Sequence, residues 1–315
     1  MGPALMTVVS APPAPQASAP QRPAPPSRPT ARRRRRGGAL ARTGPLKYLA
    51  HAGVWLYVVL LAAPLYYLVI SAFKHNTDIF TQPFSPFTPL TFDNFGLAFS
   101  QASLGTALVN SAYITIGAEV LTLALAVPAA FALARAKGAV GQLVERVFAL
   151  GFLIPGFAAL VPTVLLSIMM GLFHTREFLI LFLPASAMPL TVILLTQAMR
   201  AVPAELEESA RLDGAGPLRV LWSVYVPLAI PTLTVVAILN FLSFWNEYFF
   251  SLVIIGPEAS LRTAQVALPT LSIANAAQYG VLAAGILITL IPAYLVYAVF
   301  AEKMENAVLA GALKG

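Results

Sequence analysis

Residues 208–214 read Glu-Ser-Ala-Arg-Leu-Asp-Gly, and residues 224–227 read Val-Tyr-Val-Pro. They belong to a charged, helix-compatible segment that lies between two long apolar runs. Pro203 suits the first turn of a short helix, and the acidic residues after it place negative charge at its positive end. Asp213-Gly214 then breaks the helix and lets the chain turn into a second short helix, from Leu218 to Tyr225. We therefore expect a folded helix-turn-helix on a membrane surface, shaped to be held by another protein.

The composition is that of a membrane protein. Hydrophobic residues make up 58% of the 315 residues and charged residues only 10%, and the mean hydropathy is +0.77. Apolar runs of about 20 residues recur, and each can cross a hydrocarbon core of roughly 30 Å. The sequence contains no cysteine, so disulfides, zinc–thiolate sites and cysteine nucleophiles are excluded. The isolated His51, His75 and His174 match no metal-ligand spacing, so we expect no metal and no cofactor.

The apolar runs predict an all-α integral membrane protein with six transmembrane helices. The predicted spans are residues 53–73, 108–133, 147–173, 178–199, 224–255 and 281–300. The run 224–255 is longer than one span needs, so its first residues are expected to enter from the membrane surface. Prolines are expected to bend two of them: Pro155 and Pro162 would kink the third span, and Pro184 and Pro189 would interrupt the fourth. The charged helix-turn-helix falls between spans four and five.

The basic residues predict the orientation. With six spans, all of the 20 Lys and Arg residues fall on one side of the membrane except Lys74, Arg176 and Arg262. Basic residues are retained in the cytoplasm, so that side and both termini are predicted to be cytoplasmic. The charged helix-turn-helix would then be cytoplasmic as well.

The chain is expected to have two regions. Residues 1–45 are rich in Pro, Ala, Ser and Arg and nearly free of aromatic side chains, so they bury too little apolar surface to fold and form a disordered cytoplasmic tail. Residues 46–315 form the transmembrane domain, with a core at about 105–300. The arginine cluster of the tail is interpreted as a topology signal with lipid contact, and no nucleic-acid partner is expected.

The sequence lacks the motifs of several enzyme classes. It contains no Gly-x-x-x-x-Gly-Lys-Ser/Thr loop to cradle nucleotide phosphates, no His-Glu-x-x-His and no Gly-x-Ser-x-Gly. We therefore expect no catalytic residues. If ATP drives a process that this chain takes part in, the nucleotide site must belong to another polypeptide.

The charged segment resembles the cytoplasmic coupling loop of the permease subunits of binding-protein-dependent ABC transporters. That family's pattern is Glu-Ala-Ala, a Gly four residues after the second Ala, nine arbitrary residues and then Ile-x-Leu-Pro. Glu208, Ala210, Gly214 and Pro227 fall in register with it. Ser209 replaces the first Ala, Asp213 precedes the Gly as is familiar in the family, and Val224 and Val226 stand for Ile and Leu. The resemblance implies that Glu208, Ser209, Ala210, Asp213, Gly214 and Pro227 form the site that couples this chain to an ATPase.

Polar residues within the spans are the candidates for a substrate pathway. Glu119 and Glu247 lie in apolar runs, where a carboxylate should face protein or water. Trp245, Asn246 and Glu247 combine an aromatic face with amide and carboxylate groups, which suits a sugar. They resemble a Trp-Asn-Glu segment of carbohydrate-uptake permeases, although Trp245 packing in the core and Glu247 bonding to a neighbouring helix remain open alternatives.

Asn110 and Ser111 resemble the Asn-Ser pair that opens the second span in the same family. An amide within a span is costly unless it is hydrogen-bonded. We expect Asn110 to satisfy backbone or interhelical hydrogen bonds and to have a structural role together with Ser111.

The resemblance implies a permease subunit of a sugar importer of the maltose type, in the plasma (inner) membrane of a bacterium. The implied partners are a second permease subunit in a heterodimer, a cytoplasmic ABC ATPase dimer and an extracytoplasmic sugar-binding protein. Alternating access driven by the ATPases would move the substrate. Three alternatives are open: a permease of the same fold for a non-sugar solute, an ion-coupled transporter that uses Glu119 or Glu247, and a membrane scaffold.

Overall fold

The computed structural model describes residues 45–153, 156–273 and 278–312. It divides into two compact units, residues 1–56 and 57–315. The described part of the first unit is the beginning of helix α1 (Pro45–Ala72), and the rest of α1 belongs to the second unit. The sites described below lie in the second unit. The predicted disordered tail lies outside the described residues apart from Pro45, and it stays a prediction.

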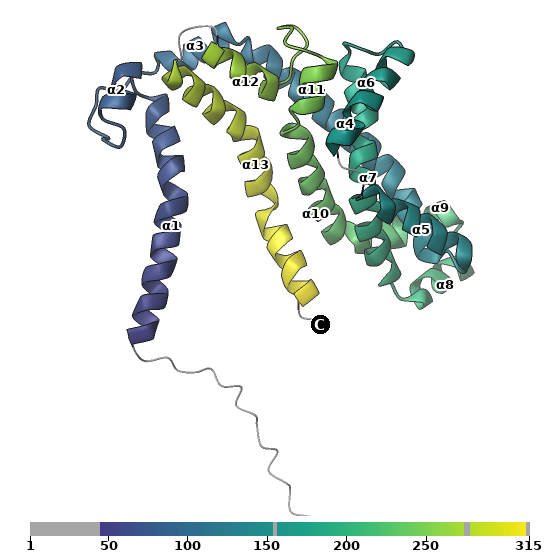
Figure 1. Ribbon diagram of the computed structural model, residues 1–315. Helices are drawn as coiled ribbons and strands as arrows, with labels where there is room; N and C mark the ends of the chain where they lie inside the picture. Colours follow the sequence, from purple (N-terminus) through teal and green to yellow (C-terminus); the bar gives the residue numbers. More distant parts are fainter. Residues whose placement is uncertain (1–44, 154–155, 274–277, 313–315) are drawn as a thin grey trace, which may run out of the picture. The chain divides into compact units, whose positions relative to one another are not determined.

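Every regular element in the described part of the chain is a helix, as the sequence predicts. Five helical runs are long and apolar enough to cross a membrane (Figure 1). These runs are Tyr48–Ala72 of α1, α4 (Leu104–Arg135), α7 (Arg176–Arg200), the run Pro217–Trp245, and Tyr279–Phe300 of α13 (Tyr279–Ala312). The chain is therefore a multi-pass membrane protein. The interruption expected within residues 178–199 is wrong, because α7 continues through Pro184 and Pro189 as one helix.

The region of the predicted third span, residues 147–173, is not one helix. It contains the end of α5 (Ala139–Gly151), a 3-10 turn η1 (Gly156–Ala159) and α6 (Leu160–Met169), and the two arms meet at 94°. The described helices therefore give five spans, or six if this bent pair is one broken span. Pro155, one of the two expected kinks, lies outside the described residues. Pro162 is in the first turn of α6, where a missing N–H costs no helical hydrogen bond.

The fifth span differs from the predicted run 224–255 at both ends, because the candidate span is Pro217–Trp245. Its helical run begins at Pro217 with α9 (Pro217–Val220), continues as a π-helical turn η2 (Leu221–Tyr225) and then as α10 (Val226–Trp245). The helix ends at Trp245, and after three non-helical residues the short helix α11 (Phe249–Ile254) begins. Hydropathy does not register this break because the residues on both sides of it are apolar.

Small residues let the long helices α4 and α7, which pack extensively against each other, come close together. Ala118, Ala126 and Ala130 of α4 are fully buried, and a Cβ on Gly117 would come within 3.0 Å of the Ile180 side chain of α7. In a membrane the hydrophobic effect does not drive helices together, so close van der Waals packing of small residues takes its place.

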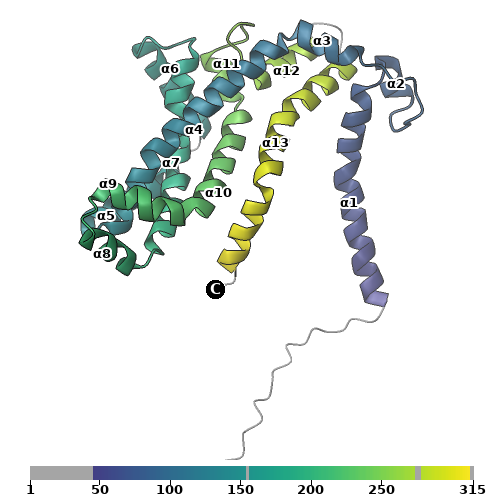
Figure 2. The same cartoon turned by 180° about the vertical axis from the view of Figure 1, so that it is seen from behind.

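Short helices lie at the ends of the long ones. Near the start of α4 are α3 (Asp93–Gln101) and α12 (Ala264–Ile273), and α2 (Asn76–Thr81) lies beyond α3, close to the end of α1 (Figure 1). Near the other end of α4 are α8 (Ala204–Leu212) and α9. Figures 1 and 2 show these two groups at opposite ends of α4. The second group contains the charged segment, residues 208–214.

Candidate functional site

The charged segment folds as α8 and a defined turn. Pro203 precedes the helix, and acidic residues stand in its first turn, where their charge complements the helix dipole. The helix ends in a Schellman motif: the N–H of Ala215 donates to the C=O of Ala210 (3.0 Å), and the N–H of Gly214 donates to the C=O of Arg211 (3.0 Å). These two bonds fix the direction in which the chain leaves α8.

Gly214 is the turn residue, with φ of +81° and no atom within 4 Å of where a Cβ would be. A substitution there is strained by the backbone alone, without a clash. We expect Gly214→Ala to destabilise the end of α8 by about 1–2 kcal/mol, and Gly214→Asn to cost less because asparagine tolerates this conformation. Amide hydrogen exchange across α8 measures both. Equal protection in the alanine variant and the unsubstituted chain would contradict the assignment of Gly214 as the residue that holds the turn.

The π-helical turn η2 connects the turn region to α10. Its hydrogen bond runs from the N–H of Val226 to the C=O of Leu221, five residues back. Pro227 follows directly, and a proline clashes with the carbonyl four residues before it in an α-helix. The wider π-turn gives that carbonyl room, which explains why the helix widens here.

Three groups converge on the carboxylate of Glu207. Its Oε1 accepts from Nη2 of Arg135 and from Nη2 of Arg211, both at 2.6 Å, and its Oε2 accepts from the Tyr225 hydroxyl at 2.6 Å. The Arg135 guanidinium also lies 4.6 Å from the centre of the Phe131 ring, which contacts the Tyr225 ring edge to face. Arg135 ends α4 and Tyr225 ends η2, so Glu207 ties α8 to both.

A groove of about 370 Å³ lies between α8 and the start of α10. Its lining residues are Leu206, Ser209, Ala210, Asp213, Ser223, Val224, Pro227 and Leu228. The structure thus brings together four of the six residues that the sequence singled out for the coupling site, from two segments of the chain. Of the other two, Glu208 is exposed on α8 and Gly214 forms the turn.

A larger cavity, about 530 Å³, lies between α4, η2, α10 and α13. Aliphatic and aromatic side chains form most of its lining, and Glu119 is its one acidic residue. Both Glu119 carboxylate oxygens are buried beside Asn240, yet neither has a hydrogen bond of normal geometry to a residue that the structure describes. A buried, unpaired polar group is costly inside a membrane protein, which makes Glu119 a functional candidate.

Trp245 is not among the residues that line this cavity. It is 4% exposed, its indole N–H donates to the C=O of Thr289 (3.1 Å), and its ring stacks on Phe241 at 5.8 Å. Phe241 does line the cavity. In this structure Trp245 therefore packs against Phe241 on the side away from the cavity that Phe241 lines.

Asn246 and Glu247 form the break between α10 and α11. The Asn246 side chain is exposed and accepts a hydrogen bond from Gln265 (3.2 Å). The Glu247 carboxylate accepts the N–H groups of Phe250 (2.7 Å) and Ser251 (2.8 Å), which have no partner within the short helix α11. Glu247 also lines a third cavity, of about 260 Å³. Its carboxylate thus caps a helix at the edge of a cavity.

Asn110 and Ser111 connect α4 to the segment between α11 and α12. Asn110 Nδ2 donates to the backbone carbonyls of Ser260 (3.0 Å) and Arg262 (3.1 Å), and its Oδ1 accepts from Nη1 of Arg176 (2.7 Å). The Ser111 hydroxyl oxygen accepts the N–H of Ala264 (2.9 Å), the first residue of α12. Burial also lowers the pKa of the nearby Arg262.

Sequence reasoning missed Glu207, Arg135 and Tyr225 as members of the site. The family pattern begins at the next residue, Glu208, so it does not include Glu207. A signal was present, because Glu207 and Arg211 are spaced four residues apart on a short helix, the spacing of an ion pair. The contact with Arg135 has no local signal, since it joins residues far apart in the chain.

The fold is that of a multi-pass helical membrane protein. Its sequence lacks a nucleotide-binding loop, and four of the six residues that resemble a coupling site line one groove between α8 and α10. Residues 123–307 match the model of the family described as binding-protein-dependent transport system inner membrane component. The chain belongs to this family and is a permease component of an ABC transporter, a membrane subunit without enzymatic activity of its own.

Relatives with assigned roles match most of the chain. The diacetylchitobiose uptake system permease protein NgcG of Streptomyces coelicolor is 32% identical over 84% of this chain and 88% of that protein. The melibiose/raffinose/stachyose import permease protein MelC of Bacillus subtilis is 28% identical over 80% of this chain and 91% of that protein. The probable starch degradation products transport system permease protein AmyC of Thermoanaerobacterium thermosulfurigenes is 28% identical over 80% and 91%, respectively.

Two solved structures share the fold. A crystal structure of a bacterial ABC transporter involved in the import of the acidic polysaccharide alginate matches with a TM-score of 0.70 and 23% identity, over 83% of this chain and 98% of that one. A bacterial alginate ABC transporter in complex with an alginate pentasaccharide-bound periplasmic protein matches with a TM-score of 0.62 and 15% identity, over 84% and 94%.

Proposed function

We propose that this chain is one of two permease subunits of an ATP-driven importer that takes up a sugar delivered by an extracytoplasmic binding protein. The observation that carries the proposal is the agreement between the family and the groove. Relatives named for sugar uptake match over 80% or more of the chain, and four of the six expected coupling-site residues, from α8 and the start of α10, line one groove. Alternating access, powered by ATPases that are separate polypeptides, would move the sugar.

In this proposal the bent pair α5–α6 is the third of six spans, both termini are cytoplasmic, and α8 is the coupling helix. The distribution of Lys and Arg supports the orientation, because only Lys74, Arg176 and Arg262 fall on the other side. The partners are a second permease subunit in a heterodimer, an ABC ATPase dimer that docks on α8, and the sugar-binding protein. Residues 1–45 form the cytoplasmic tail.

The substrate pathway is proposed to include the cavity that holds Glu119. The Glu119 carboxylate, which is buried and accepts no hydrogen bond of normal geometry from the described residues, would become an acceptor for sugar hydroxyls when the cavity opens to substrate. Aromatic and aliphatic lining side chains would contact the apolar sugar faces. Trp245 supports Phe241 at this wall, while Asn246 and Glu247 position the end of α10 beside the pathway.

A matched pair of variants on α8 tests the docking. Glu205 and Glu208 are both exposed on this short helix, so their glutamine variants remove the same charge at two positions. If Glu208 makes a charge-assisted contact with the ATPase, Glu208→Gln should lower sugar uptake and sugar-stimulated ATP hydrolysis by roughly tenfold. Glu205→Gln should leave both near the unsubstituted level.

The complex is purified with its partner subunits and reconstituted in liposomes with the binding protein, and uptake of labelled di- and oligosaccharides is measured. Full activity of both variants would reject the docking role of Glu208. Uptake by the chain in the absence of any ATPase, driven by a proton gradient, would reject the importer mechanism itself.

A further inference from the structure

The segment of residues 79–92, here called the Phe/Pro segment, holds bulky apolar side chains out of the protein. Phe87 is 93% exposed, and Phe80, Phe84, Leu90 and Phe92 are each at least 60% exposed. The segment contains no charged residue and three prolines. Such a surface is unsuited to water, and exposed apolar patches mark contacts with another molecule or with a membrane.

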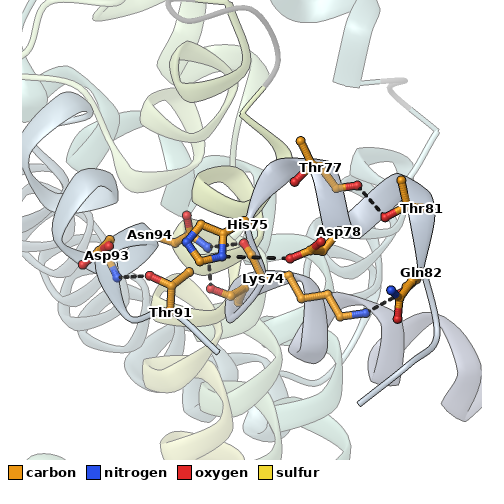
Figure 3. Close-up of polar contacts among 10 residues, drawn as sticks. Lys74, His75, Thr77, Asp78, Thr81, Gln82, Thr91, Asp93 and Asn94 are labelled. Atoms are coloured by element: carbon orange, nitrogen blue, oxygen red, sulfur yellow. Dashed lines mark hydrogen bonds and ion pairs between the residues drawn. The ribbon is translucent and has the colours of Figure 1, made fainter. Parts of the chain in front are cut away.

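The beginning of the segment is fixed to the end of α1 by a buried lysine. Lys74 is 1% exposed, and its ammonium donates to the carbonyls of Gln82 (2.6 Å) and Pro83 (3.3 Å). Figure 3 shows this side chain extended toward Gln82, beneath α2. Two backbone carbonyls accept hydrogen bonds from the ammonium, so Lys74 acts here as a structural crosslink.

The far end of the segment returns to the same place. The N–H of Thr91 donates to the C=O of Phe73 (2.8 Å), and Asn94 Nδ2 donates to the carbonyls of Ala72 (2.9 Å) and Lys74 (2.8 Å) (Figure 3). These bonds satisfy carbonyls at the end of α1 that have no helical partner. The Phe/Pro segment is therefore a closed loop with fixed ends.

Between its fixed ends, the loop folds back along α1. The Tyr66 hydroxyl donates to the C=O of Phe84 (3.0 Å), and the Tyr67 and Phe84 ring centres are 5.7 Å apart. Tyr66 precedes the last residue of α1, Ala72, by about 9 Å along the helix axis at 1.5 Å per residue. The loop thus reaches beside a part of α1 whose neighbouring surface, at Leu65 and Val69, is itself exposed and apolar.

We propose that the Phe/Pro segment lies in the boundary between lipid headgroups and acyl chains and anchors this end of the protein in the bilayer. Three features fit this occupant. The loop continues the apolar surface of a membrane span, it reaches a depth of the size expected for interfacial segments, roughly 5–10 Å, and its prolines carry no backbone N–H that would need a partner there. In the proposed orientation this is the extracytoplasmic leaflet, but the bilayer contact does not depend on that assignment.

Spin labels test the depth of the segment. The chain has no cysteine, so Phe87→Cys and Leu90→Cys each create a single labelling site in it, and both side chains are exposed and outside the packed core. Val59→Cys on α1 is the lipid-exposed control, and Ala259→Cys, exposed between α11 and α12, is the aqueous control. The complex is reconstituted in phosphatidylethanolamine–phosphatidylglycerol liposomes without a binding protein.

The readout is the ratio of label accessibility to oxygen, which partitions into lipid, and to a water-soluble nickel chelate. For an interfacial segment we expect ratios at positions 87 and 90 that exceed the ratio at 259 by roughly threefold or more and stay below that at 59. Ratios equal to that at 259 would place the segment in water and overturn the proposal. Low accessibility to both reagents would show that a partner protein covers the segment, and this outcome would overturn it as well.

Discussion

Replacing Glu207 with glutamine is expected to release α8 from the rest of the protein and to uncouple transport from ATP hydrolysis. The variant loses the anion that pairs with Arg135 and Arg211, both at 2.6 Å. The Arg135 pair is the more shielded of the two, with side chains 25% and 14% exposed. A charge-assisted hydrogen bond of this kind contributes about 1.5–3 kcal/mol, so the docked position of α8 should be weakened by tenfold or more.

Arg211→Gln is the matched control for Glu207→Gln. It removes only the pair within α8, whose arginine is 54% exposed, and an exposed pair at this spacing is worth about 0.3–0.5 kcal/mol. Amide hydrogen exchange across α8 should therefore accelerate strongly in Glu207→Gln and little in Arg211→Gln, with sugar uptake falling in the same order. Identical exchange in the two variants would show that the contacts with Arg135 and Tyr225 do not hold α8 in place.

Replacing Asn110 with leucine is expected to be the most destabilising of the substitutions considered. Leucine has a similar shape but makes none of the three hydrogen bonds that Asn110 makes to Arg176 and to the backbone of Ser260 and Arg262. One of these bonds is buried and two are partly buried. A buried group left unpaired costs about 1–3 kcal/mol and an ordinary hydrogen bond contributes about 1 kcal/mol, so the total loss of stability should be about 3 kcal/mol. Thermal unfolding of the purified complex measures this loss.

Ser111→Ala is the control variant with which the loss of stability in Asn110→Leu is compared. It removes a single hydrogen bond, from the N–H of Ala264 at 2.9 Å, and should cost about 1 kcal/mol. Asn110→Asp should fall between the two, because it keeps an acceptor for Arg176 but loses the donor to the carbonyls. If Asn110→Leu unfolds at the same temperature as Ser111→Ala, the amide is not the link between α4 and the segment before α12.

Much of the fold could be predicted from hydropathy, because a span must be apolar over its whole length. The all-helical class and the positions of α1, α4, α7 and α13 follow from that rule. The bent structure of residues 147–173 could not be predicted in this way, since both arms of the 94° bend are apolar. The ends of the fifth span were missed for the same reason.

The site was predictable only where its residues are neighbours in the sequence. The bounds of α8 follow from Pro203 and Gly214, which act on the backbone next to them. The hydrogen bond of Asn110 to Arg262 joins residues 152 positions apart, and no pattern in a single sequence indicates such a pair. For Trp245 the local sequence was misleading. It suggests that the ring stacks on a ligand, whereas in the folded protein the ring stacks on Phe241 and the indole N–H bonds to Thr289.

The attachment of one carboxylate to two long helices limits how this end of the protein can move. Glu207 bonds to the last residue of α4 and to the turn from which α10 starts, so the two helices share a single point of control and cannot be displaced one without the other while those bonds last. Since α4 is 32 residues long, about 48 Å, even a small tilt imposed there becomes a shift of several ångströms at the opposite membrane face.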